Sequence, residues 1–290
     1  MTTELDGKVA VVTGAGQGLG RAEALELAGQ GARVVVNDYD AEAAETVAAE
    51  IRDRGGDALA APGDVGDFVT GQGLVSRAIE ELGSLEILVN NAGILRDRMV
   101  FSMSEQEWDD VIRVHLKGHF NTCQAATTYW RGRSKELGAP VYGRVINTSS
   151  EAFLFGSPGQ PNYAAAKAGI TSLTMAIANG TGRYGVRANA ICPRAYTQMT
   201  AGVFGDDLKE MTPEKVAPFV AYLASPAADQ INCQVFVVYG DMVALMAAPP
   251  VEKRFHAEGD AWDVEGLADT ITPYFAGRDP EQTFVARELL

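Results

Sequence analysis

The sequence predicts an α/β protein built on a parallel sheet with helices on both faces. Short runs rich in Val, Ile and Leu alternate with helical segments from the start of the chain. These runs are continuously apolar rather than alternating, which is typical of strands buried on both faces. A glycine-rich segment, TGAGQGLG at 13–20, joins the first run to the first helix. Together these features predict a doubly wound sheet.

About seven strands are expected, most of them followed by a helix. The strands cover Lys8–Thr13, Ala32–Asp38, Asp57–Ala61, Glu86–Asn90, Arg144–Thr148, Val186–Cys192 and Val235–Tyr239. The helices cover 18–29, 40–54, 67–82, a stretch from about 104, 161–183 and 212–224. Pro213 suits the first turn of the last helix, where its missing N–H costs nothing. Right-handed crossovers bring the carboxyl ends of the strands to one edge, where ligands bind.

The chain has 290 residues but no interior linker, charge block or low-complexity stretch. One domain at 1–240 is therefore expected, and it is long enough to bury a substantial core. Residues 241–290 form a C-terminal extension. It carries too many aromatic side chains for a solvated tail, namely Phe255, Trp262, Tyr274, Phe275 and Phe284. We expect it to pack on the rim of the sheet or on a partner subunit.

Composition excludes several classes of partner. The net charge is −14 and no basic stripe is present, which argues against nucleic acid and against an anionic membrane surface. The longest apolar runs are far below a membrane span, and the N-terminus lacks an apolar signal core. Cys123, Cys192 and Cys233 show no metal or redox spacing. The protein is expected to be cytoplasmic.

The glycine-rich segment predicts a dinucleotide site. Gly14, Gln17, Gly18, Leu19 and Gly20 follow a strand and open a helix. Glycines let the backbone turn tightly and approach a pyrophosphate, which then lies over the helix N-terminus. With the strand, the helix and a downstream acid all present, a Rossmann-type fold is indicated.

Asp38 ends the second strand, where a carboxylate accepts hydrogen bonds from both ribose hydroxyls of NAD and repels a 2′-phosphate. No basic residue adjoins it, so NAD is expected rather than NADP. The alternative is a strand-end turn residue.

Two further strand ends are expected to border the cofactor. Asp64 and Val65 follow the third strand and are placed to contact adenine. Asn91, Ala92 and Gly93 follow the fourth strand and are placed to shape the floor beneath it. Either group alone could equally be a set of ordinary loop residues without a binding role.

A phenol, an ammonium and a hydroxyl stand at a spacing suited to proton transfer. Tyr163 and Lys167 lie one helical turn apart in YAAAK, and Ser150 precedes Tyr163 by thirteen residues. A neighbouring ammonium and the positive nicotinamide ring are expected to lower the pKa of the phenol. Tyr163 then acts as general base or acid, while Ser150 holds the substrate oxygen. Ser149 is the competing hydroxyl, and the offset to Tyr163 favours Ser150.

These motifs resemble the short-chain dehydrogenase/reductase family from residue 7 to about 240. The matching segments are TGAGQGLG, NNAG at 90–93, Ser150 and YAAAK. Three segments, at 91–99, 113–118 and 159–167, resemble the (3R)-hydroxyacyl-CoA dehydrogenase unit of multifunctional enzymes type 2. The resemblance implies that Lys167 hydrogen-bonds the nicotinamide ribose and that Pro193 and Thr197 border the nicotinamide.

The chain departs from that family at two positions. His115 stands in VHLKG where most members have Asn. A histidine there could hold the water of a proton relay or pass the proton itself, since its pKa lies near neutrality, and simple packing is the alternative. Arg194 follows Pro193 where many relatives have Gly. His115 and His119 are four residues apart, but no third ligand is apparent and no metal is expected.

The loop after Pro193 resembles a substrate lid to about residue 211. Met199, Val203, Phe204 and Met211 are expected either to line an apolar acyl or steroid pocket or to pack within the loop.

The expected activity is NAD-dependent exchange of a secondary alcohol and a ketone, on a 3-hydroxyacyl thioester or a steroid-related substrate. The alternatives are a reductase of 3-oxoacyl thioesters and, in a different class, an NAD(H)-sensing scaffold without turnover. By resemblance, a homodimer or homotetramer is expected, formed through the helices near 104–137 and 161–183.

Overall fold

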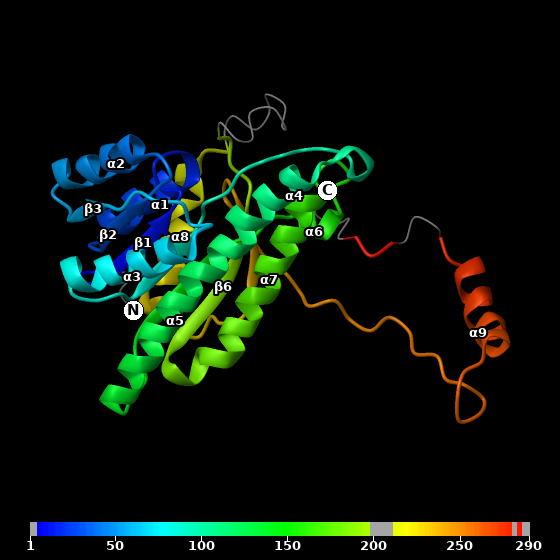
Figure 1. Ribbon diagram of the computed structural model, residues 1–290. Coiled ribbons are helices and arrows are strands. Elements are labelled where there is room, and N and C mark those ends of the chain that lie inside the picture. Colours follow the sequence, from blue (N-terminus) through cyan, green and yellow to red (C-terminus); the bar gives the residue numbers. More distant parts are fainter. Residues whose placement is uncertain (1–4, 198–210, 280–282, 286–290) are drawn as a thin grey trace. The chain divides into compact units, whose positions relative to one another are not determined.

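The computed structural model describes residues 5–197, 211–279 and 283–285, and its strands form one twisted sheet (Figure 1). The strand order is β3-β2-β1-β4-β5-β6-β7-β8, and every pairing except β7 with β8 is parallel. The strands are β1 (Val9–Thr13), β2 (Arg33–Asn37), β3 (Ala58–Ala60), β4 (Ile87–Asn90), β5 (Gly143–Thr148), β6 (Val186–Pro193), β7 (Val235–Tyr239) and β8 (Met242–Leu245). The predicted Rossmann-type parallel sheet is confirmed.

Helices alternate with the strands as the sequence predicts. They are α1 (Gly18–Gly29), α2 (Ala41–Asp53), α3 (Phe68–Leu82), α4 (Glu105–Ile112), α5 (Gly118–Leu137), α6 (Ala152–Phe155), α7 (Pro161–Thr181), α8 (Ala217–Ala224) and α9 (Val264–Ala276). Pro213 opens a short 3₁₀ turn ahead of α8. Within the described ranges, no helix is both long and apolar enough to cross a membrane.

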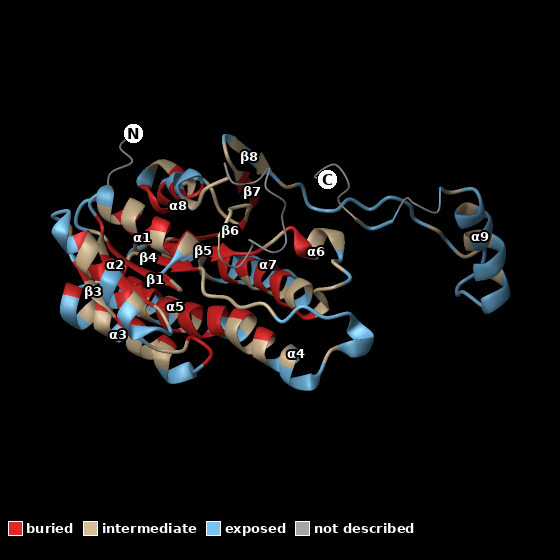
Figure 2. Ribbon diagram, turned by 90° about the horizontal axis from the view of Figure 1, so that it is seen from above, coloured by how far each residue is buried: buried red, intermediate tan, exposed pale blue. Residues whose placement is uncertain are grey.

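The sheet is buried on both faces, which explains its unbroken apolar runs. In β1 the side chains of Ala10 and Val12 face one core, together with α1, α2 and α8. Val9 and Val11 face the other core, with α3, α5 and α7. Figure 2 shows the buried strands between the two helical layers. Because alternate residues enter different cores, a strand here has no polar face.

An eighth strand lies beyond the expected seven. β8 pairs antiparallel with β7 in the register Tyr239↔Met242, so only Gly240 and Asp241 form the turn. Gly240 has φ +56°, which a two-residue hairpin requires of its first central residue. The Gly-Asp pair is a hairpin signal that reasoning from longer apolar runs passes over.

The strand order reverses between β1 and β4, which places the site. β1 pairs with β2 on one side and with β4 on the other, so the loops leaving β1 and β4 diverge. In open α/β sheets a ligand crevice forms at this switch point. The glycine-rich segment and the NNAG segment leave the sheet here.

Buried side-chain amides link the carboxyl ends of β4 and β5. Asn90 Nδ2 donates to Asn147 Oδ1 at 2.9 Å, and Asn147 Nδ2 donates to Thr174 Oγ1 on α7 at 2.9 Å. Asn90 Oδ1 accepts a 2.6 Å bond from Thr122 Oγ1 on α5. All four residues are buried, so this amide chain joins two strands and two helices below the site.

The chain divides into two compact units, 1–246 and 247–290. In the second unit Tyr274 on α9 lies edge-on to Phe255 at 5.3 Å, and its hydroxyl donates to Glu252 Oε1 at 2.7 Å. Arg278 also bonds Glu252, at 3.0 Å. The packing of this extension on the sheet rim or on a partner subunit stays a prediction.

Candidate functional site

A cavity of about 580 Å³ follows the carboxyl edge of the sheet. Its walls are the loops after β1, β2, β3, β4 and β6, the end of β5, the turn before α5 and the start of α7. Of the predicted site residues, all but Gly20 and Ser150 line it, namely Gly14, Gln17, Gly18, Leu19, Asp38, Asp64, Val65, Asn91, Ala92, Gly93, His115, Tyr163, Lys167, Pro193 and Thr197. Residues from seven separate segments of the chain therefore converge on one cavity.

The glycine-rich segment leaves room for a ligand and for close packing. Gly14 has φ +62°, and a Cβ there would lie 2.7 Å from Ala92 Cα. A Cβ on Gly20 would lie 2.3 Å from the Gly14 carbonyl oxygen, so Gly20 serves packing rather than lining. Gln17 gives α1 no side-chain cap. The first N–H groups of α1 are thus available to an anion, which fits a pyrophosphate.

Asn91 joins the loops that border the cavity after β1 and β4. Its Nδ2 donates to the carbonyl oxygens of Thr13 and Gly14 at 3.2 and 3.1 Å. Thr13 Oγ1 in turn accepts from the N–H groups of Asn91 and Ala92. The loops after β1 and β4 are therefore tied together beneath the site.

Asp38 is held at the cavity wall by backbone donors. Its Oδ2 accepts from Gly16 N–H at 2.9 Å, and its Oδ1 accepts from Asp40 N–H at 3.0 Å. A carboxylate has about four lone-pair sites, so each oxygen keeps one for a further donor. The arrangement fits a pair of ribose hydroxyls. Tyr39, which follows and is 81% exposed, also lines the cavity and was missed in the sequence, where exposure cannot be read.

Asp64 lies at the cavity with its charge already paired. Its Oδ2 lies 2.8 Å from Arg113 Nη1, and its Oδ1 accepts from Gly66 N–H at 2.8 Å. Val65 is buried beside it, and its carbonyl oxygen accepts from Asn121 Nδ2 at 2.8 Å. Contact of this pair with adenine stays a prediction.

The two neighbouring serines have different partners. Ser149 is buried, and its hydroxyl bonds the Lys167 carbonyl oxygen and Thr171 Oγ1 at 2.9 and 2.8 Å. Ser150 is half-buried, and its hydroxyl lies near enough to the Tyr163 phenol to lower the pKa of that phenol. Ser150 is therefore the serine that shares a site with Tyr163.

Burial decides the protonation of Tyr163 and Lys167. Desolvation raises the pKa of Tyr163 to about 12, although the neighbouring Ser150 hydroxyl acts the other way. Desolvation lowers the pKa of Lys167 to about 7, and its Nζ donates to the Thr148 carbonyl oxygen at 2.6 Å. The expected lowering of the phenol's pKa by Lys167 is thus wrong for the ligand-free chain. Removal from water disfavours both the phenolate and the ammonium, and the attraction between these two charges does not compensate for that cost.

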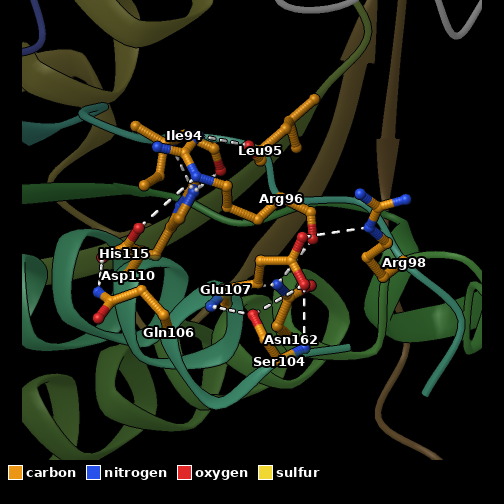
Figure 3. Close-up of polar contacts among 10 residues, drawn as sticks. All are labelled: Ile94, Leu95, Arg96, Arg98, Ser104, Gln106, Glu107, Asp110, His115 and Asn162. Carbon is orange, nitrogen blue, oxygen red and sulfur yellow. Dashed lines mark hydrogen bonds and ion pairs between the residues drawn. The ribbon is translucent and has the colours of Figure 1, made fainter. Parts of the chain in front are cut away.

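His115 projects from a single π-helical turn, Arg113–Lys117, between α4 and α5. Figure 3 shows it against the loop after β4, where its Nε2 lies 2.9 Å from Ile94 N and 2.8 Å from Ile94 O. Its ring is edge-on to Tyr163 at 5.2 Å. Burial, with the charge of Lys167, holds the pKa of His115 well below its usual value. A pKa near neutrality, on which the relay hypothesis depended, is therefore wrong.

Asn162 is a buried residue that the sequence reading did not single out. Its Nδ2 donates to the carbonyl oxygens of Arg96 and Glu107, both at 3.0 Å. Its Oδ1 accepts from Tyr163 N–H at 2.8 Å. Figure 3 shows the amide between the loop after β4 and α4, which begins with a capping box of Ser104 and Glu107. Asn162 thus ties both segments to the turn that carries Tyr163.

The loop after β6 borders the cavity at Pro193 and Thr197. Tyr196 N–H donates to the Met211 carbonyl oxygen at 2.6 Å, so the two ends of the expected lid lie together. Met199, Val203 and Phe204 lie outside the described residues.

His119 lies one turn beyond His115. Its Nδ1 lies 2.7 Å from the His115 carbonyl oxygen, and burial lowers its pKa to about 3. Within the described part of the chain, no group of three His, Cys, Asp or Glu side chains is placed to hold a metal.

Known proteins match this chain over most of its length. Hydroxyacyl-CoA dehydrogenase ChsB1 of Mycobacterium tuberculosis is 53% identical over 302 residues, covering 100% of this chain and 95% of that protein. Peroxisomal multifunctional enzyme type 2 of Drosophila melanogaster is 44% identical over 234 residues, covering 77% of this chain and 38% of that protein. A solved short chain dehydrogenase from Mycobacterium avium superimposes with a TM-score of 0.86 at 43% identity, covering 95% of this chain and 97% of that one.

The family model for short chain dehydrogenase matches residues 8–207. This segment holds the glycine loop, the NNAG segment and the Ser150, Tyr163 and Lys167 side chains whose geometry is given above. Both levels of the resemblance found in the sequence are confirmed. The chain is an oxidoreductase and belongs to the short-chain dehydrogenase family.

Proposed function

We propose that this protein oxidises the secondary alcohol of a 3-hydroxyacyl thioester, with NAD as its cofactor. The observation that carries the proposal is the meeting of Ser150, Tyr163 and Lys167 at the edge of a dinucleotide-sized cavity. A hydroxyl, a phenol and an amine at that place suit proton exchange with an alcohol or ketone.

Each side chain has a separate part in that exchange. Bound NAD supplies the hydride acceptor. Ser150 donates a hydrogen bond to the substrate oxygen as charge develops there. Tyr163 takes the hydroxyl proton during oxidation and returns it during reduction. Lys167 in its protonated form stabilises the phenolate, and with a pKa of about 7 its amine is about half protonated at neutral pH.

The raised pKa of Tyr163 bears on the direction of the reaction. With a pKa of about 12 the phenol is protonated at neutral pH, which suits an acid in ketone reduction. Alcohol oxidation requires the phenolate, so we infer that a filled cavity lowers this pKa. A nearby positive charge has that effect on a buried phenol.

We infer NAD rather than NADP from the fixed carboxylate of Asp38. A 2′-phosphate beside it would meet like charge within a partly buried site. Arg113, a cation of the cavity wall, is paired with Asp64 at 2.8 Å. The matched test is kcat/KM with each cofactor for wild type and Asp38→Ser. Equal kcat/KM of the wild type with NADP and NAD would contradict the proposal.

His115 is proposed to hold the cavity wall rather than to titrate. Its Nε2 engages the Ile94 backbone, and its lowered pKa keeps the ring neutral. A neutral imidazole at this position fixes the loop through 94–96 and packs against Tyr163.

A hydroxyacyl-CoA is the proposed substrate class because ChsB1, at 53% identity, is named a hydroxyacyl-CoA dehydrogenase. The test is NADH formation across a panel of 3-hydroxyacyl-CoAs of increasing acyl length, with hydroxysteroids beside them. Oxidation of the thioesters with NAD is the expected result. Turnover confined to NADPH and 3-oxoacyl carrier protein would favour the reductase. Silence across the panel, despite NADH binding, would favour the non-catalytic scaffold.

A homodimer or homotetramer is proposed from the apolar side chains on α4, α5 and α7. Trp108, Phe120 and Met175 are 39%, 46% and 42% exposed on these helices. Helix faces of this kind are typical of subunit interfaces. Light scattering of the intact chain measures the mass, and a monomer at micromolar concentration would contradict the proposal.

A cytoplasmic location is proposed from the cysteines. Cys123, Cys192 and Cys233 are all free thiols, and burial raises the pKa of the first two to about 12. Free buried thiols are usual in a reducing compartment.

A further inference from the structure

Two side chains of opposite charge face each other beyond the ends of β5 and β6. Glu151 directly follows Ser150, and Arg194 directly follows Pro193. β5 and β6 are parallel neighbours, so the two loops leave the sheet side by side. The charged pair therefore links the loop of the serine proposed to hold the substrate oxygen to the loop that begins at Pro193.

The contact between them has a defined geometry. Arg194 donates through Nε and Nη2 to the two carboxylate oxygens of Glu151, at 2.5 and 2.6 Å. The Glu151 side chain is 8% exposed and that of Arg194 is 23% exposed. The guanidinium also lies 4.7 Å from the ring centroid of Tyr239, at the end of β7. A two-pronged guanidinium–carboxylate contact fixes orientation as well as distance.

Stability alone is a poor explanation for such a pair. The cost of removing two charges from water offsets most of their attraction, so a buried ion pair adds little net stability. What it does provide is one preferred arrangement of the two segments that carry it. Here those segments follow the adjacent strands β5 and β6, at the edge of the sheet that bears the cavity.

The Ser150 hydroxyl depends on the same turn. Its Oγ accepts from Ala152 N–H at 3.1 Å. The Glu151 carbonyl oxygen accepts from Leu154 N–H at 2.8 Å at the start of α6. A movement of Glu151 therefore moves both the backbone of Ser150 and the donor that orients its hydroxyl.

We propose that the Glu151–Arg194 pair is a positioning pair that fixes the Ser150 hydroxyl relative to the cavity wall at Pro193. Neither Glu151 nor Arg194 is among the residues that line the cavity, so the pair acts through Ser150. This inference rests on the proposed function, because it assigns the pair a role in that reaction. It also gives a reason for Arg194, at which the chain departs from the Pro-Gly of many relatives.

The first test is kinetic, with 3-hydroxydecanoyl-CoA as the probe. Glu151→Gln keeps the shape of the side chain but removes its charge, and kcat should fall about 10- to 100-fold, as expected for a misplaced catalytic group. The Kd for NADH, from its fluorescence, should stay within about threefold, since ground-state binding is not the function lost. Arg194→Lys keeps the positive charge but cannot make both hydrogen bonds, so its kcat should lie between those of wild type and Glu151→Gln.

A second set of variants, made in the Ser150→Ala protein, distinguishes a positioning role from a purely stabilising one. In a Ser150→Ala protein, Glu151→Gln should cause no further loss of kcat, because its target is gone. Arg133→Met is the matched control, since it removes an Arg–Glu contact of 2.6 Å in which both side chains are about half exposed. This control should behave as wild type. A pair with only a supporting role would lower the melting temperature and leave kcat unchanged, which would overturn the inference.

Hydrogen exchange gives a readout that needs no turnover. In Glu151→Gln the peptide covering 149–156 should lose protection, while peptides from β1 and α1 should not. If the wild type oxidised no thioester, the proposed function would fail, yet this measurement would still decide the inference. Unchanged protection at 149–156 would overturn it.

Discussion

Glu23 makes the stability of this fold depend on pH in an unusual direction. It lies on α1, is 0% exposed, and neither of its carboxylate oxygens has a hydrogen-bond partner within the described residues. Burial raises its pKa to about 8, from 4.5 for an ordinary glutamate. At neutral pH the folded chain therefore keeps Glu23 protonated, whereas the unfolded chain ionises it.

The size of the effect follows from these two values. Because the pKa is raised in the folded state, the native protein holds the extra proton between about pH 4.5 and 8. Stability should then fall as pH rises through that window, by at most about 1.4 kcal/mol for each pH unit. Between about pH 6 and pH 7.5 the free energy of unfolding should fall by about 2 kcal/mol from this group alone. Above pH 8 the contribution should be constant.

Urea unfolding followed by circular dichroism measures this slope. Glu23→Gln does not titrate, so the variant should lose about 2 kcal/mol less than wild type over the same pH interval. Glu26→Gln is the matched control on the same helix, where Glu26 accepts a bond from Gln30, and it should keep the wild-type slope. Parallel curves for wild type and Glu23→Gln would refute the reasoning.

Three further substitutions test the site. Tyr163→Phe should keep NADH binding and lower kcat by about 10²- to 10⁴-fold, the contribution of a positioned acid or base; a near-normal rate would remove Tyr163 from the mechanism. His115→Asn should leave the pH profile of kcat unchanged, because the pKa of the buried imidazole is already well below its usual value; a shifted profile would restore the relay. Asn162→Asp places a carboxylate against two carbonyl oxygens, so the free energy of unfolding should fall by about 2–4 kcal/mol, and an unchanged melting temperature would contradict the observed bonds.

Local patterns predicted the parts of the site that depend on spacing. The glycine loop, Asp38 and the Tyr163–Lys167 pair each occur at a strand end or within one helical turn, where short-range rules decide position. The sequence favoured Ser150 over Ser149 only through its offset from Tyr163. The structure gives a physical reason, because the Ser149 hydroxyl is hydrogen-bonded to α7.

Burial and long-range contacts lay beyond such patterns. YAAAK does not show how far Tyr163 is removed from water, so the direction of its pKa shift was predicted wrongly for the ligand-free chain. The same holds for His115, whose pKa depends on a π-helical turn that folds it inward. Asn162 escaped notice because its partners, Arg96 and Glu107, lie more than fifty residues away.

The short final strand shows a different limit. β8 has four residues and alternates between half-buried and exposed positions, so it lacks the continuous apolar run that revealed the other strands. Its only clear signal was the Gly-Asp turn before it.

The amide chain through Asn90 and Asn147 makes β4 and β5 intolerant of changes in length. A one-residue deletion in either strand would turn its amide to the opposite face of the sheet and set apolar side chains against the polar partners left behind. An insertion would have the same result, and each buried amide left unpaired would cost about 1–3 kcal/mol. Evolution and engineering can therefore vary the loops that enter these strands from the far edge, whereas the count of residues from Ile87 to Asn90 and from Gly143 to Asn147 must stay constant.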